Sequence, residues 1–219
     1  MNYRIKISGI DEIISIKDSY TPIFVRNKTI FKSLALEPLE NIILFNDNRI
    51  IELDKYVTII SDLFKIELND NKIIKSLYKK IEINIDKYYE KEKRIINELI
   101  LELISYNQIE FGNLEFNNTL DIGKLLSNYS IKYEEVSKDN YLNYILKYIK
   151  IQAELLGIKA VITYGLINLL NADEISQIAK ELDNIGVILV DIIPGETERM
   201  INSVEIDEDY CIIWYVLAY

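Results

Sequence analysis

The sequence contains no histidine and only one cysteine, Cys211, among its 219 residues. Without histidine, the chain cannot build a histidine-based catalytic triad, use an imidazole as a general base or bind zinc through histidine. A single cysteine excludes an intrachain disulfide, as is typical of a reducing compartment, and it excludes thiolate zinc sites. Any bound metal is therefore expected to be a hard cation with oxygen ligands, such as calcium or magnesium.

Glycine and proline are scarce, with seven and three residues, so few residues are spent on turns and linkers. The apolar run 211–219 has nine residues, about half of the roughly 18 that a membrane-spanning helix needs. This run predicts a C-terminal strand, in which Cys211 is expected to be a small buried hydrophobic residue and not a nucleophile. The N-terminus has no signal-peptide core, and the sequence predicts a cytoplasmic protein without a membrane partner.

The apolar pattern of the last third predicts a parallel α/β sheet. Two continuous apolar runs, 158–164 and 187–192, flank a helix expected from 172 to about 184. Buried strands that alternate with helices are typical of parallel sheets. A final strand at 210–217 would complete the sheet, and the N-terminal strands are expected to join it.

The first 60 residues are rich in strand patterns, and a helical insertion follows them. Residues 3–7 and 12–16 alternate like a strand pair, and Asn46-Asp47-Asn48-Arg49 predicts a hairpin turn. Asp70 is a candidate N-cap for a helical pattern that extends to about residue 106. Most globular helices are shorter, so we expect a break near Asn84 and Asp86.

These patterns divide the chain into an α/β head, residues 1–61 and 150–219, and a helical leg, residues 62–149, inserted into the head. Within the last part of the leg, a short helix is expected from Asp121 to Tyr129 and another begins near residue 139. The length of the chain fits one large domain with a substantial insertion.

A parallel sheet raises the question of nucleotide binding. A P-loop needs a glycine, four residues and then Gly-Lys-Ser/Thr, because its amides and lysine hold phosphate. The one Gly-Lys pair, Gly123-Lys124, has Asn118 in the first-glycine position and Leu125 in place of Ser/Thr. Asp191 imitates the magnesium-binding aspartate of a P-loop ATPase, but without a phosphate loop it is expected to be a strand-end residue. The sequence predicts no nucleotide cofactor and no enzyme; a divergent nucleotide hydrolase that uses Asp191 is the alternative.

Charge is distributed unevenly. Of the 25 basic and 35 acidic residues, only 2 basic but 11 acidic residues lie in 160–219. The stretch 72–94 is the most basic, with eight basic and four acidic residues. Local asymmetry of this kind indicates a basic surface for a partner, although a solvated helix face with internal ion pairs is the simpler alternative.

Two acidic clusters contain oxygen ligands that a hard cation prefers. Glu110, Glu115 and Asp121 lie in or beside an asparagine-rich loop, but their spacing matches no EF-hand loop, and a solvated loop is the alternative. The acidic residues of 205–209 precede the terminal strand and are expected to supply turn and surface polarity.

Four segments share an order and spacing with a known family. Phe45–Arg49 precedes an Ile/Leu strand, and Ile60–Ile66 leads into the long helix. Leu114-Glu115-Phe116 precedes 121–126 and 131–134, and Val187–Pro194 is followed by Ile206–Ile213, the most specific pair. In these segments, which span nearly the whole chain, the sequence resembles the short form of the DNA-encircling spacer-acquisition protein of type II-A CRISPR–Cas systems.

The resemblance implies a P-loop-NTPase-like head with a parallel-rich sheet, no working P-loop and an inserted helical leg. It also implies a non-catalytic homotetrameric ring that holds double-stranded DNA in a basic hole. The family acts in antiviral defence, beside the CRISPR integrase pair and the RNA-guided effector nuclease. In the family, calcium ions bound by acidic residues support the ring. The resemblance therefore implies that Glu115 and Asp121, and less directly Glu110, are calcium ligands. The loop that contains them is richer in asparagine here than in relatives.

A chain of net charge −10 is expected to hold DNA only through a segregated basic surface. Lysine predominates among the basic residues near the long helix, and lysine suits phosphate contact without base reading. The candidate DNA contacts are Lys75, Lys79, Lys87, Lys91, Arg94, Lys132, Lys138, Lys147 and Lys150. A protein-interaction scaffold that holds no DNA is the remaining alternative.

Overall fold

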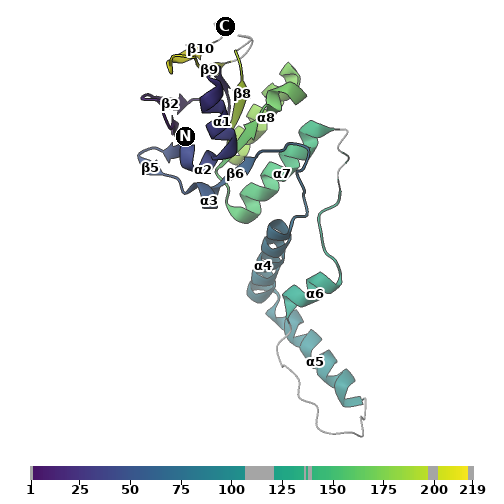
Figure 1. The fold of residues 1–219 in the computed structure, drawn as a ribbon. Coiled ribbons are helices and arrows are strands. Elements are labelled where there is room, and N and C mark those ends of the chain that lie inside the picture. Colours follow the sequence, from purple (N-terminus) through teal and green to yellow (C-terminus); the bar gives the residue numbers. More distant parts are fainter. Residues whose placement is uncertain (1, 107–120, 136, 138–139, 197–201, 217–219) are drawn as a thin grey trace. The chain divides into compact units, whose positions relative to one another are not determined.

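The computed structural model describes residues 2–106, 121–135, 137, 140–196 and 202–216 (Figure 1). Its contacts divide the chain into two units. The first comprises Met1–Leu68 and Glu135–Tyr219, and the second comprises Asn69–Glu134. The second unit interrupts the first in sequence, but it is shorter at both ends than the leg expected over 62–149.

The difference at the boundary arises because helix α7 (Tyr141–Leu156) and the segment before residue 69 pack together in the first unit. The hydroxyl of Tyr141 donates to the carbonyl of Leu63 at 2.7 Å, and the hydroxyl of Tyr144 donates to the carbonyl of Ile66. Leu63 and Ile66 are buried, as are seven residues of α7. A helical pattern alone could not assign α7 to either unit.

A six-stranded sheet forms the centre of the first unit, in the order β10-β9-β3-β8-β7-β6. Its strands are β3 (Tyr20–Val25), β6 (Val57–Ile60), β7 (Ala160–Tyr164), β8 (Ile188–Pro194), β9 (Ser203–Ile206) and β10 (Ile212–Tyr215). All neighbours pair in parallel except β10, which is antiparallel to β9 at the edge. The predicted parallel-rich α/β fold is therefore confirmed, with the runs at 158–164 and 187–192 in adjacent strands.

The other N-terminal strands form a separate antiparallel sheet, ordered β2-β1-β4-β5. They are β1 (Tyr3–Ile7), β2 (Ile13–Ile16), β4 (Ile42–Asn46) and β5 (Arg49–Ile50). The expectation that these strands join the parallel sheet is wrong; only β3 and β6 do. Burial in β1 alternates residue by residue, as in an antiparallel sheet with one face toward the core, whereas β3 is buried at all six positions.

One apolar core lies between the two sheets. It unites the inward side chains of the antiparallel sheet, two residues of α1 (Lys28–Leu36) and one face of the parallel sheet. Helix α8 (Ala172–Ile185) contacts β3, β8 and α7. An Asn171–Glu174 capping box starts α8, and Gly186 ends it with a φ of 68°. Short helices α2 (Pro38–Asn41), α3 (Leu53–Tyr56) and η1 (Leu166–Leu169) connect the strands.

The second unit contains α4 (Asn71–Tyr88), α5 (Glu90–Tyr106) and α6 (Ile122–Asn128). Asp70 caps α4 as expected, accepting from the amides of Lys72 and Ile73. The helix breaks at Tyr89, where φ is −129° and ψ is 31°, and not at Asn84 or Asp86. No helix of the described residues has both the length and the apolar character of a membrane span.

Candidate functional site

Ligands of open α/β folds bind outside the carboxyl ends of the strands. Here the connection from β3 to α1 at that edge is two residues long, Arg26-Asn27. The Asn27 side chain accepts from the amides of Thr29 and Ile30 at 3.0 and 3.2 Å. These amides of the first turn of α1 are therefore bonded within the protein. The pattern of residues 23–36 is compatible with a strand followed by a short helix, as observed, but it does not reveal the capped amides of this connection.

Asp191 is fully buried on β8, with four donors around its carboxylate. Oδ1 accepts from Thr163 Oγ1 at 2.8 Å and from the Leu166 amide at 2.9 Å. Oδ2 accepts from the Ile167 amide at 2.8 Å and from the Tyr20 hydroxyl at 3.2 Å. Asp191 lies in the middle of β8, not at its end as expected, and its carboxylate caps η1.

The electrostatics of Asp191 agree with a structural role. Burial raises the pKa of its carboxyl, and the four hydrogen bonds oppose that shift. Burial and the neighbouring carboxylate also raise the pKa of Tyr20, which keeps its hydroxyl a donor. A magnesium ion at Asp191 would have to displace donors that are already in place.

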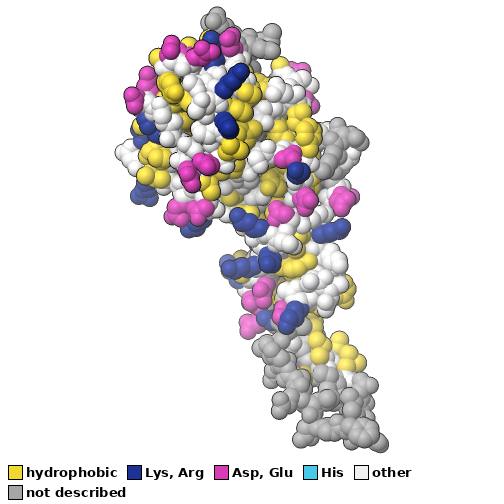
Figure 2. Space-filling model, in the orientation of Figure 1, with side chains coloured by type: hydrophobic (Ala, Val, Ile, Leu, Met, Phe, Trp, Pro, Cys, Tyr) yellow, Lys and Arg dark blue, Asp and Glu magenta, His cyan; other side chains and the backbone are white. Residues whose placement is uncertain are grey.

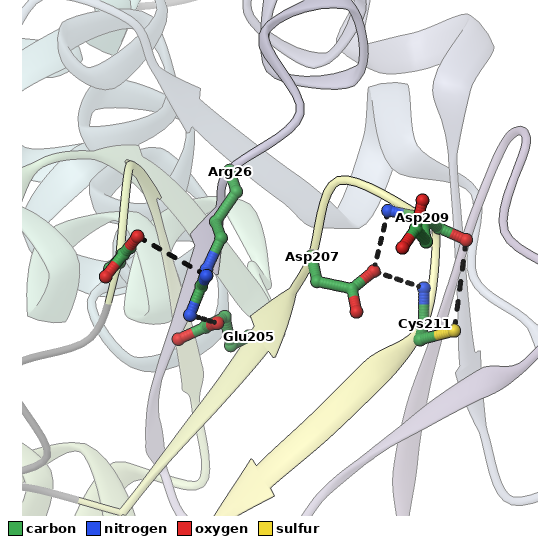
Figure 3. Close-up of polar contacts among 6 residues, drawn as sticks. Arg26, Glu205, Asp207, Asp209 and Cys211 are labelled. Atoms are coloured by element: carbon green, nitrogen blue, oxygen red, sulfur yellow. Dashed lines mark hydrogen bonds and ion pairs between the residues drawn. The ribbon is translucent and has the colours of Figure 1, made fainter.

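A second buried carboxylate, Glu205 on β9, forms an ion pair with Arg26 after β3 (Figure 3). The other terminal nitrogen of Arg26 lies 3.3 Å from Glu196, which follows β8. The amide of Arg26 also donates to the carbonyl of Ile206 at 2.9 Å. Arg26 therefore joins three neighbouring chain segments at the carboxyl edge of the sheet, in a structural role.

Removing this guanidinium should take away the ion pair that Arg26 forms with a buried carboxylate. We expect Arg26→Ala to lower the free energy of unfolding in urea denaturation by more than the roughly 0.5 kcal/mol of an ordinary surface substitution. Arg26→Ala combined with Glu205→Gln should recover part of that loss, since the buried charge is then gone as well. A change in Arg26→Ala of under about 0.5 kcal/mol, the range of ordinary surface substitutions, would contradict the structural role.

The acidic run before β10 forms a turn. Asp207 Oδ1 accepts from the amides of Asp209 and Cys211 at 2.9 and 2.8 Å (Figure 3). Between them, Tyr210 adopts a φ of 67°. Cys211 is exposed, so the expectation of a buried residue is wrong: the hairpin turn holds it outside the core. Within the described ranges, no three His, Cys, Asp or Glu residues are grouped as metal ligands.

Of the three candidate calcium ligands, only Asp121 lies among the described residues. Glu110 and Glu115 lie outside the described residues. Asp121 Oδ1 accepts from the Lys124 amide at 2.9 Å, and its Oδ2 lies 3.3 Å from Lys124 Nζ. The Lys124 amide and ammonium lower the pKa of Asp121. Its carboxylate is thus the N-cap of α6, and by itself it supplies no calcium site.

The basic candidates fall into two units. Lys75 and Lys79 on α4, Lys87 at its end, Lys91 and Arg94 on α5, and Lys132 lie in the second unit, whereas Lys147 and Lys150 lie on α7 in the first. Lys138 lies outside the described residues. Arg94 pairs with Glu98 at 3.5 Å, and Lys150 pairs with Glu181 at 2.6 Å. Lys87 Nζ lies 4.9 Å from the ring centroid of Tyr88.

Lys75 and Lys79 differ from these paired residues. Both are exposed, and so is Lys72, which was not among the candidate DNA contacts. In the described part of the chain, no acidic side chain forms an ion pair with any of the three. Their spacing of three and four residues places them along one side of α4, and we call Lys72, Lys75 and Lys79 the lysine ridge. Figure 2 shows basic side chains over this part of the second unit, with acidic side chains next to them.

No protein-family model and no curated protein matches this sequence. Among solved structures, the chain is similar to an ABC transporter ATP-binding protein from Pyrococcus furiosus, with 11% identity, a TM-score of 0.35 and coverage of 90% of this chain and 94% of the other. It is also similar to an ATP-binding cassette of an ABC transporter in its ADP conformation, with 13% identity, a TM-score of 0.39 and coverage of 90% and 83%. At such low identity and TM-scores, the activity of these proteins is not assigned to this chain.

Proposed function

We propose that this protein is a non-catalytic, double-stranded DNA-binding protein of CRISPR spacer acquisition that acts as a homotetrameric ring. The lysine ridge carries the DNA-binding part of the proposal. Its three exposed ammonium groups extend over about 10 Å of α4. No acidic side chain of the described residues pairs with these cations, and in a chain of net charge −10 such a row supports the segregated basic surface that phosphate binding requires.

The proposed role in spacer acquisition is inferred from the family resemblance. The proposed partners, the integrase pair and the effector nuclease, are inferred from the same resemblance. We further infer a P-loop-like head without a working P-loop. The short Arg26-Asn27 connection, the capped amides of α1 and the four donors around Asp191 support this inference. Detectable ATP binding in calorimetry would instead favour the nucleotide hydrolase.

The ring can be tested by mass and by topology. We expect mass measurement in solution to give a tetramer, and linear duplex DNA to add to its mass. A ring that encircles DNA should slide off linear duplex when the free ends are open, but should remain when bulky blocks close both ends. Equal retention on open and blocked duplexes would contradict encirclement while leaving DNA binding itself intact.

Calcium binding stays a prediction from the resemblance. If Glu110, Glu115 and Asp121 bind calcium near a subunit contact, millimolar calcium should raise the melting temperature or the share of tetramer by mass action. Magnesium at the same concentration is the control, because it prefers a stricter octahedral geometry. An unchanged melting temperature and assembly state across millimolar calcium would rule out this ligand assignment.

A further inference from the structure

The outer face of the antiparallel sheet carries large apolar side chains. Cross-strand pairing places its outward residues in two rows. They are Ile13, Lys6 and Ile43 in the first row, and Ser15, Arg4, Phe45 and Ile50 in the second. Ile13, Ile43 and Ile50 are 46%, 42% and 67% exposed. The solvent face of such a sheet is usually polar, so three exposed isoleucines in adjacent rows indicate a surface that a partner covers.

The charge of this face has one sign. None of the seven outward positions is acidic, although acidic residues outnumber basic ones by 35 to 25 in the chain. Lys6 lies between Ile13 and Ile43 and donates to the carbonyl of Asp11 at 2.6 Å. The Arg4 guanidinium lies 5.7 Å from the ring centroid of Phe45 and donates to Asn48. The two cations are thereby held among the apolar side chains.

The combination of exposed apolar and basic side chains restricts the kind of partner that can cover this face. Two copies of the face packed against each other would bring Arg4 and Lys6 close to the same cations, and such like-charge contacts are unfavourable. DNA would supply the opposite charge, but its contacts are predominantly polar, and it would leave the isoleucines against phosphate and sugar. A protein segment with both acidic and apolar side chains complements both properties.

We propose that the outer face of the antiparallel sheet binds a protein segment in which acidic and apolar side chains occur together, from a partner other than this chain. The acidic side chains meet Arg4 and Lys6, while the apolar ones cover Ile13, Ile43 and Ile50. This docking surface does not depend on DNA binding by the lysine ridge.

The probes are two synthetic peptides, one of alternating glutamate and valine and one of alternating lysine and valine, measured by fluorescence anisotropy. The protein should bind the glutamate peptide in preference to the lysine peptide. Ile43→Ser should weaken that binding about tenfold, as expected for one buried aliphatic side chain. Lys6→Glu should abolish the preference or reverse it. Lys28→Glu makes the same charge change on α1 and is the matched control, which should leave binding unchanged.

Three results would overturn the proposal. The first is no binding of the glutamate peptide, or equal binding of both peptides. The second is loss of self-association in Ile43→Ser and Lys6→Glu, seen by sedimentation, which would make the occupant a second copy. The third is loss of duplex DNA binding in the same two variants, with both still folded by thermal melting, which would assign the face to nucleic acid.

Discussion

An Asp191→Asn variant is expected to lose about 3 kcal/mol of unfolding free energy. An asparagine presents one acceptor and one donor where the carboxylate presents two acceptors. Its amide group would face either the Leu166 amide or the Ile167 amide, each of which now donates to Asp191 at 2.9 or 2.8 Å. One backbone donor would then be left buried without an acceptor, and its desolvation is the main cost.

Substitutions of two residues that donate to Asp191 show how much the loss of a single hydrogen bond costs. Thr163→Val and Tyr20→Phe each remove one donor to Asp191 and should cost about 1 kcal/mol in the same urea denaturation. Below its melting transition, Asp191→Asn should still bind duplex DNA like the wild type. Reproducible ATP turnover that disappears in this variant would contradict the structural role and would assign Asp191 to catalysis.

The second large effect is expected on the lysine ridge. At physiological salt, each phosphate neutralised contributes roughly a fivefold gain in affinity, from a slope near −0.9 in log K against log salt. Lys75→Ala with Lys79→Ala should therefore weaken duplex binding on the order of 10- to 30-fold for each ridge in contact with DNA. The salt slope should become shallower by about 0.9 for each lost contact, and a symmetric tetramer multiplies the effect.

The matched control for the ridge is Lys28→Ala with Lys32→Ala. These lysines are exposed on α1 in the first unit, and they are four residues apart like Lys75 and Lys79. Both double variants change the net charge equally, so a general charge effect would weaken both alike. Equal loss of affinity in the two double variants would show that the lysine ridge is not the DNA-binding surface.

Local patterns were sufficient to predict most of the elements of this fold. Asp70 and the alternation in 3–7 act within a few residues, and both occur in the structure as expected. The assignment of strands to two sheets depends on pairing between distant segments, such as β1 with β4. The helix break at Tyr89 and the place of α7 in the first unit also depend on tertiary packing, which periodicity does not contain.

The candidate sites were predicted less completely, for the same reason. Asp191 was noticeable in the sequence, but its four donors come from β3, 171 residues away, and from β7 and η1, which lie 24 to 28 residues before it. The ion pair between Arg26 and the buried Glu205 joins residues separated by most of the sequence. Lys72 could have been included with Lys75 and Lys79 from helical spacing alone, because all three lie on one side of α4.

The most direct test of DNA binding is the salt dependence of wild-type affinity for duplexes of equal length and unrelated sequence. Fluorescence anisotropy between about 50 and 200 mM salt covers the range in which phosphate contacts are lost. We predict equal affinities for all duplexes and a linear fall of log K with log salt, with a slope of several units. Absence of binding at the lowest salt, or an affinity that does not change with salt, would contradict the proposed function.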